Sequence, residues 1–203
     1  MMLETYIENE IIPRYLGFDR AHGPEHAKSV IDRSLKLAEI YGLDLRMVYA
    51  AAAYHDTGLA EGRERHHLVS GRIIREDRML REWFTEEQIE TIAEAAEDHR
   101  ASAAREPRSI YGRVLAEADR QIDPELTVRR TVQYGLSHYP EMGKEEHWRR
   151  MLEHLQEKYA EGGYLKLLIP ESDNARRLEE LRSLMKDRSR LREIFEKEYS
   201  EGA

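Results

Sequence analysis

The nine residues VYAAAAYHD, at positions 48–56, indicate a tightly packed helix that ends in a histidine and an aspartate. Alanine has the highest helix propensity, and its small side chain lets neighbouring helices approach closely. Helical spacing places His55 on the face of Val48, Ala51 and Ala52, which is the apolar face. The segment therefore predicts a buried helix with an inward-facing His-Asp pair at its end.

The same helical period extends over nearly the whole chain, and nothing in the sequence alternates in the manner of a β-strand. The expected fold class is therefore all-α. Glycine, proline and capping residues mark the ends of the segments, as at Gly42 and Pro124 and in the capping box of Thr85 with Gln88. The expected helices lie near residues 2–14, 24–41, 44–56, 66–80, 85–99, 109–121, 124–138, 144–160 and 173–199.

A length of 203 residues suits one compact domain, because no linker, repeat or low-complexity tract divides the chain. We expect a single domain over 1–203, with a core at about 19–125 and a helical C-terminal extension at 126–203. The last expected helix carries an apolar stripe opposite a charged face. Packing on the core is the favoured interpretation of this stripe, and a homodimer contact is the alternative.

The composition excludes several classes of protein. Cysteine is absent, so the chain has neither disulfides nor thiolate metal ligands. The formal net charge of −8 argues against a binder of nucleic acid duplexes, since such binding depends on clustered Lys and Arg. No apolar run approaches the roughly 20 residues needed to span a bilayer, and the N-terminus lacks the features of a signal peptide. We therefore expect a cytoplasmic protein without a membrane partner.

Several ionisable side chains lie on apolar helix faces. His26, His55, His67, His99 and Asp119 each fall in phase with small or aliphatic residues of their own segments. Burying one such group proves little, but a buried charge is costly unless it is paired or binds a metal. Five inward-facing groups on separate helices therefore point to a shared divalent cation. His66 falls on a different face from His67 and is expected to be exposed.

The order of these residues resembles a known signature. HGPEH at 22–26, the pair His55-Asp56 and LAEADR at 115–120 look like the H…HD…D pattern of the HD superfamily, and HxxxG at 67–71 adds to the resemblance. The resemblance covers roughly residues 19–125. It implies a multi-helix HD fold and a metal-dependent phosphohydrolase similar to the small stand-alone HD hydrolases.

The resemblance also assigns roles to residues. It implies His26, His55, Asp56 and Asp119 as the primary metal ligands, with His67 and His99 binding a second ion where two are held. His22 would line the substrate pocket. The chemistry of the residues themselves adds that Asp56 or a nearby carboxylate could steer the proton of the attacking water, and that Arg120 and Arg63 or Arg65 could neutralise the phosphate. Glu61, Glu64, Arg63 and Arg65 are all candidates for the charged group that often follows the HD pair. One departure is Ser29, which stands where the family often has an arginine.

Three functions stay open at this stage. The favoured one is hydrolysis of a nucleotide or another small phosphate ester by a water that the metal activates. The alternatives are a di-iron oxygenase on the same scaffold and a regulatory domain that binds metal without turnover. Imidazole and carboxylate ligands suit one or two ions of Mn, Fe, Co, Ni, Zn or Mg, and the sequence does not choose among them.

Overall fold

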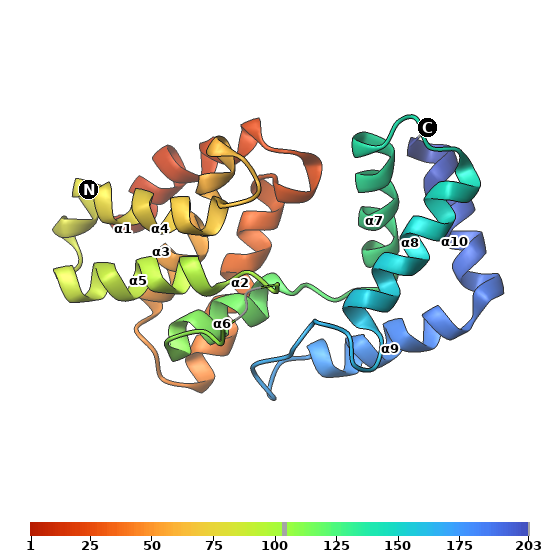
Figure 1. The fold of residues 1–203 in the computed structure, drawn as a ribbon. Helices are drawn as coiled ribbons and strands as arrows, with labels where there is room; N and C mark the ends of the chain where they lie inside the picture. Colours follow the sequence, from red (N-terminus) through yellow and green to blue (C-terminus); the bar gives the residue numbers. More distant parts are fainter. Residues whose placement is uncertain (103–104, 203) are drawn as a thin grey trace. The chain divides into compact units, whose positions relative to one another are not determined.

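The computed structural model describes residues 1–102 and 105–202 of the chain. Over these residues the secondary structure is helical, with short 3-10 and π segments between the α-helices and no strand. This confirms the all-α fold class. The described residues form two compact units. In Figure 1 the first is coloured red to green, apart from the blue segment Leu168–Ser172, and the second is coloured teal to blue.

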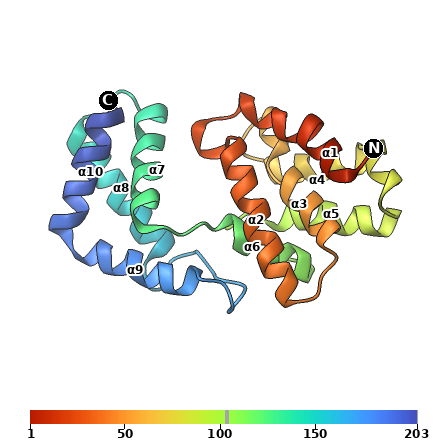
Figure 2. The same cartoon turned by 180° about the vertical axis from the view of Figure 1, so that it is seen from behind.

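The first unit consists of residues Met1–Gln121 together with Leu168–Ser172. Helix α2 packs against α3 and α6, and α5 packs against α3, α4 and α6 (Figure 2). Between these helices lies an apolar core that includes the alanines of the 48–56 segment, all of them buried. The α-helices of this unit are α1 (Leu3–Tyr6), α2 (Pro24–Ile40), α3 (Leu45–Tyr54), α4 (His66–Glu76), α5 (Glu86–Asp98) and α6 (Ile110–Asp119).

The second unit consists of Ile122–Leu167 and Asp173–Ala203 and has an apolar core of its own. Its helices are α7 (Pro124–His138), α8 (Lys144–Tyr159), α9 (Asn174–Lys186) and α10 (Arg188–Gly202). The apolar stripe of the C-terminal segment packs into this core, with Leu184, Leu191 and Phe195 buried. The stripe thus packs within the chain, but in the core of the second unit and not on the core expected at about 19–125. The single-domain assignment and the homodimer stay predictions.

Local sequence explains where the helices begin and end. Thr85 and Gln88 form the expected capping box at the start of α5, and the side chains of Asp44 and Asp123 cap α3 and α7. Gly42 follows α2 with a φ of 61°, which a residue with a Cβ rarely adopts. These signals confirm most of the expected boundaries to within a few residues.

Three of the expected helices differ from the structure. The segment expected as a helix at 2–14 starts as α1 but continues as a π turn (Ile7–Ile11) and a 3-10 helix (Ile12–Gly17). The helix expected at 66–80 ends at Glu76, because the side chain of Asp77 caps a new 3-10 helix by accepting a hydrogen bond from the backbone of Met79. The helix expected at 173–199 is two helices that meet at Asp187, whose side chain accepts a hydrogen bond from the backbone of Arg190.

In residues 1–102 and 105–202, each helix is too short or too polar to cross a lipid bilayer.

Candidate metal centre

Histidine and aspartate side chains from five helices of the first unit converge on one buried place. His26 comes from α2, and His55 and Asp56 follow the last turn of α3. His66 opens α4, His99 follows α5, and Asp119 ends α6. Within the described part of the chain, two groups have ligand atoms close enough to hold a metal ion, namely His26 with His55 and Asp56, and Asp56 with His66 and His99.

Close packing after α3 brings Asp56 beside the start of α4. The backbone N–H of Gly58 donates to the hydroxyl of Ser70 at 2.9 Å. A Cβ at Gly58 would lie 2.1 Å from the carbonyl oxygen of His66, so a glycine is needed for this approach. The hydroxyl of buried Tyr15 donates to the carbonyl of Ala53 at 2.9 Å and accepts from the N–H of Asp56 at 3.2 Å. The His55-Asp56 pair is therefore fixed by the contact of Gly58 with α4 after it and by the hydrogen bonds of Tyr15 to its backbone surroundings.

The first half of the centre lies around Oδ2 of Asp56. This oxygen is 3.3 Å from Nε2 of His55 and 3.6 Å from Nε2 of His26. Oδ1 of Asp119 is 3.3 Å from Nε2 of His26 and 3.8 Å from Nε2 of His55. The two imidazole nitrogens are 3.2 Å apart. The four groups that the resemblance implied as primary ligands are thus adjacent in space.

The second half lies around Oδ1 of the same Asp56. This oxygen is 3.3 Å from Nε2 of His66 and 3.4 Å from Nε2 of His99, and the two nitrogens are 3.2 Å apart. The carboxylate of Asp56 therefore points one oxygen into each half. Asp56 is 3% exposed, so both oxygens lie away from bulk solvent.

The hydrogen bonds of the imidazole rings test whether a cation fits. Nδ1 of His55 lies 2.7 Å from the carbonyl of Ala52, and Nδ1 of His99 lies 2.5 Å from the carbonyl of Ala96. Nδ1 of His66 lies 2.7 Å from the carbonyl of Arg63. Because a carbonyl only accepts, each Nδ1 carries the proton, and in the neutral ring each Nε2 is left with its lone pair.

These lone pairs face carboxylate oxygens, which are acceptors too. A buried cluster of acceptors is unfavourable unless a proton or a cation lies among them. A metal-binding histidine typically donates its other N–H to a carbonyl or carboxylate, which fixes the direction of the ring. The residues present therefore fit one or two divalent ions, as the sequence led us to expect.

The charges of the cluster shift its pKa values strongly. Burial by itself would lower the pKa of His26, but the hydrogen bonds and charges of Asp119 and Asp56 raise it to about 9. Burial opposes ionisation of Asp56, yet the charge of His55 and the hydrogen bonds of its histidine neighbours hold its pKa well below the usual range. Burial is outweighed in the same way at Asp119, whose pKa is lowered mainly by His26. Both carboxylates are therefore ionised at neutral pH.

The structure corrects the expected exposure of His66, whereas the ligand role expected of its neighbour His67 stays a prediction. His66, expected to be exposed, is only 9% exposed and belongs to the second half of the centre. His67, expected as a ligand, is partly buried and does not belong to either group of ligand atoms. The physical reason is the position of His66 on the first turn of α4, since helical side chains lean toward the N-terminus and reach past the helix end. Ser70 and Ile74, four and eight residues later, confirm that His66 lies on the buried face.

The expected catalytic residue His22 lies beside the first half of the centre. Its ring packs edge-on against that of His26, with the centroids 5.8 Å apart. Nδ1 of His22 is 2.8 Å from a carboxylate oxygen of Asp19, and Nε2 is 3.4 Å from the guanidinium of Arg63. Asp19 was not among the expected site residues, although it precedes the HGPEH motif by only three positions.

The roles of three other expected residues are less clear from their contacts. Arg120 follows α6, and its Nε and Nη1 are buried with no hydrogen-bond partner among the described residues. Burial lowers the pKa of the Arg120 guanidinium. Glu61 is ion-paired with Arg72 on the surface, and the carbonyl of Glu64 accepts a hydrogen bond from Arg100. The charged group that the family often has after the HD pair is therefore not assigned to either glutamate.

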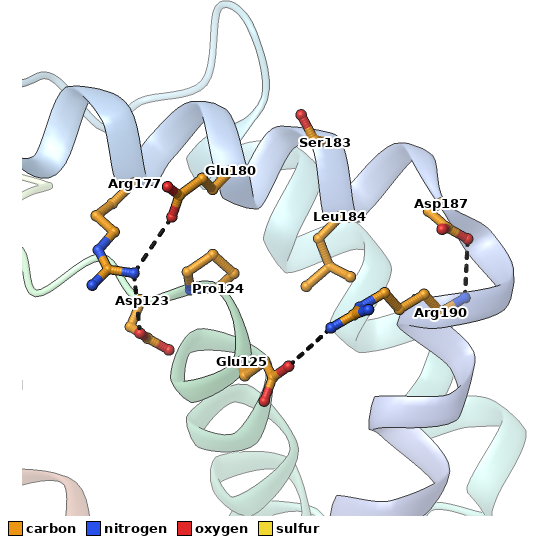
Figure 3. Close-up of a pocket in the computed structure, with 9 residues that line it drawn as sticks. All are labelled: Asp123, Pro124, Glu125, Arg177, Glu180, Ser183, Leu184, Asp187 and Arg190. Carbon is orange, nitrogen blue, oxygen red and sulfur yellow. Dashed lines mark hydrogen bonds and ion pairs between the residues drawn. The ribbon is translucent and has the colours of Figure 1, made fainter.

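A separate pocket lies in the second unit, between the ends of α7, α9 and α10 (Figure 3). Its volume is about 500 Å³. Arg177 lies 3.8 Å from Asp123 and 3.4 Å from Glu180, and Arg190 lies 3.3 Å from Glu125. Because its arginines face carboxylates that compensate their charge, this pocket lacks the uncompensated cluster found in the first unit.

Comparisons with known proteins agree with this picture. Residues 24–121 match the family model of the HD domain. A crystal structure of a protein described as a predicted HD superfamily hydrolase, from an uncultured Thermotogales bacterium, is similar in fold, with a TM-score of 0.50 and 20% sequence identity. The similarity covers 75% of this chain and 90% of the other. No curated protein matches the chain.

The matched residues contain α2 to α6, which supply every side chain of the metal centre. Residues 24–121 of this chain are an HD domain, and its histidines and aspartates form a cluster that could hold divalent metal ions. The resemblance drawn from HGPEH, His55-Asp56 and LAEADR is thereby confirmed.

Proposed function

We propose that this chain is a metal-dependent phosphohydrolase that acts on a small phosphate ester and binds two divalent ions. The observation that carries the proposal is the carboxylate of Asp56, which has histidine nitrogens within 3.6 Å of one oxygen and within 3.4 Å of the other. A carboxylate placed in this way suits a pair of metal ions, and pairs of ions are well suited to phosphoryl transfer.

The chemistry follows from the residues of the centre. A bound divalent cation supplies Lewis acidity, which lowers the pKa of a water and polarises a phosphoryl oxygen. His26, His55 and Asp119 hold the first half, and His66 and His99 hold the second. Asp56 spans both halves, and we assign the steering of the attacking water's proton to Asp56 or a nearby carboxylate. Asp119 has 24% of its side chain exposed, which indicates that the substrate approaches from its side of the centre.

The surroundings of the first half support an anionic substrate. The guanidinium of Arg63 lies 3.4 Å from Nε2 of His22, and His22 packs on His26. Of the two arginines left open by the sequence, Arg63 therefore has the contact that brings it toward the centre. We assign Arg63 to the phosphate group and His22 to the leaving-group side, where Asp19 orients its ring. The nucleotide nature of the substrate, the cytoplasmic location and the phosphate role of Arg120 stay predictions.

A panel of phosphate monoesters tests the proposal. Chelator-treated protein is reloaded with Mn²⁺, Co²⁺, Ni²⁺ or Mg²⁺, and phosphate release is measured with nucleoside monophosphates, sugar phosphates and a chromogenic phosphate ester. We expect turnover that depends on the metal, proceeds without oxygen and is lost in Asp56→Asn. Metal binding without turnover of any ester would favour the regulatory domain, and turnover that requires iron and oxygen would favour the oxygenase.

A further inference from the structure

Glu117 is a fully buried carboxylate that lies two residues before Asp119 on α6. Burying a carboxylate is costly unless donors surround it. The backbone N–H of Leu168 donates to Oε2 of Glu117 at 2.7 Å, and the hydroxyl of Ser172 donates to Oε1 at 2.5 Å. Both donors come from one segment about fifty residues further along the chain.

That segment, Leu168–Ser172, is called the strap here. It belongs to the first unit, although the residues before and after it in the sequence belong to the second. Ile169 is 2% exposed and lies in the apolar core of the first unit. The hydroxyl of Tyr41, at the end of α2, donates to Glu171 at 2.5 Å. The strap therefore connects α2, which carries His26, with α6, which carries Asp119.

The helix geometry links Glu117 to the metal centre. Successive residues of an α-helix are rotated by about 100°, so positions 117 and 119 point in directions about 200° apart. A helix whose Glu117 is held by the strap therefore has Asp119 directed to the other side, where His26 and His55 lie. On that side the carbonyl of Ala118 also accepts a hydrogen bond from Arg33 of α2, at 3.2 Å. The last turn of α6 is thus fixed from two directions.

We propose that Glu117 is a positioning residue, and that its contact with the strap holds Asp119 in the first half of the metal centre. This inference rests on the metal-binding part of the proposed function. It makes ion binding in the first half depend on a segment outside the residues that match the HD family model. Ion binding around His66 and His99 is not expected to depend on it.

Titration with Mn²⁺ tests the inference without a substrate. Glu117→Gln keeps the size of the side chain but removes its charge and replaces one acceptor oxygen by an NH₂ donor, so both strap contacts lose their charge assistance and the hydroxyl of Ser172 has to accept instead of donating. We expect the affinity for one Mn²⁺ ion to fall about tenfold, as for other groups that orient metal ligands, while the affinity for the second ion is unchanged. Electron paramagnetic resonance of the free ion measures both constants, and circular dichroism checks that helical content is kept.

A matched control comes from the second unit. Glu198 is 5% exposed and accepts from Arg129 at 3.0 Å, so Glu198→Gln removes a buried carboxylate away from the strap. This variant is expected to bind both ions as the wild type does. If Glu117→Gln does not fold, Ser172→Ala removes a single donor and is expected to lower one Mn²⁺ affinity about threefold.

The outcomes distinguish the positioning role of Glu117 from the existence of the metal centre itself. Unchanged Mn²⁺ affinities in both Glu117→Gln and Ser172→Ala would overturn the positioning role and leave the metal centre intact. A wild type that binds no Mn²⁺ would contradict the proposed metal centre and, with it, the positioning role of Glu117.

Discussion

The two halves of the metal centre differ in how they are built. In the first half His26 and His55 lie beside Oδ2 of Asp56 and Asp119 lies beside the same two histidines, and in the second half His66 and His99 lie beside Oδ1. The first half thus has one more group and a second carboxylate. More anionic ligands favour tighter binding of a hard divalent ion. On the proposal that each half binds one ion, the difference predicts tighter binding in the first half and a dependence of both halves on Asp56.

Asp56→Asn is expected to have the largest effect, because Asp56 is the one residue that faces both halves. An amide has one acceptor oxygen instead of two, so Mn²⁺ binding should fall in both halves and phosphate release should drop on the order of 1,000-fold. Elemental analysis and the phosphate assay measure the two effects. The control is Asp77→Asn, whose carboxylate accepts from Tyr6 and Tyr54 outside the centre. It should lose stability but keep its metal. Equal metal loss in both variants would mean that the loss in Asp56→Asn does not come from a ligand role of Asp56.

His26→Ala should break the first half alone. The variant loses a nitrogen 3.3 Å from Asp119 and 3.6 Å from Asp56. Mn²⁺ affinity of the first half is expected to fall on the order of 100-fold, and the metal content of dialysed protein should fall from two ions per chain toward one. Metal content that stays at two after extensive dialysis would contradict the assignment of His26.

His66→Ala and His67→Ala compare two adjacent residues at the start of α4. His66 has its Nε2 3.3 Å from Asp56, whereas His67 does not share the ligand groups. Removal of His66 should lower the metal content from two ions toward one, with a smaller loss of activity than in His26→Ala. Removal of His67 should leave the metal content at two. A reversed result, with metal lost in His67→Ala alone, would restore the sequence-based assignment.

Tyr15→Phe should have the smallest effect. The hydroxyl it removes bridges the carbonyl of Ala53 and the N–H of Asp56, so a buried donor and a buried acceptor each lose a partner. The expected cost is about 1–3 kcal/mol of unfolding free energy. We expect Mn²⁺ affinity to fall only a few-fold in both halves, because Asp56 keeps its side chain. Urea unfolding and Mn²⁺ titration measure the two quantities. A loss of metal as complete as in Asp56→Asn would contradict a role of Tyr15 that is limited to fixing the backbone of Ala53 and Asp56.

The first half could be predicted from the sequence, and the second half only in part. His26, His55-Asp56 and Asp119 lie in short motifs whose spacing identifies the family, and each falls on an apolar face. His66 and His67 both lie in phase with Ser70 and Ile74, so periodicity alone does not separate them. The choice depends on where α4 begins and how close Gly58 lies to it, which are tertiary features.

Aspartate caps and long-range contacts accompany the other differences. The helices expected at 66–80 and 173–199 are interrupted at Asp77 and Asp187, where aspartate side chains cap the segment that follows. Asp77 also accepts from Tyr6 and Tyr54, which lie 71 and 23 residues away in sequence. The strap likewise pairs Glu117 with residues 51 and 55 positions further on. No local pattern carries such information.

The metal content of the reloaded wild type tests the central claim most directly. The protein is stripped with chelator, reloaded with Mn²⁺, dialysed and examined by elemental analysis beside Asp56→Asn. We predict two ions per chain in the wild type and less than about 0.2 in the variant, because one carboxylate serves both halves. A wild type that retains no metal, or an Asp56→Asn variant that retains as much as the wild type, would contradict the account.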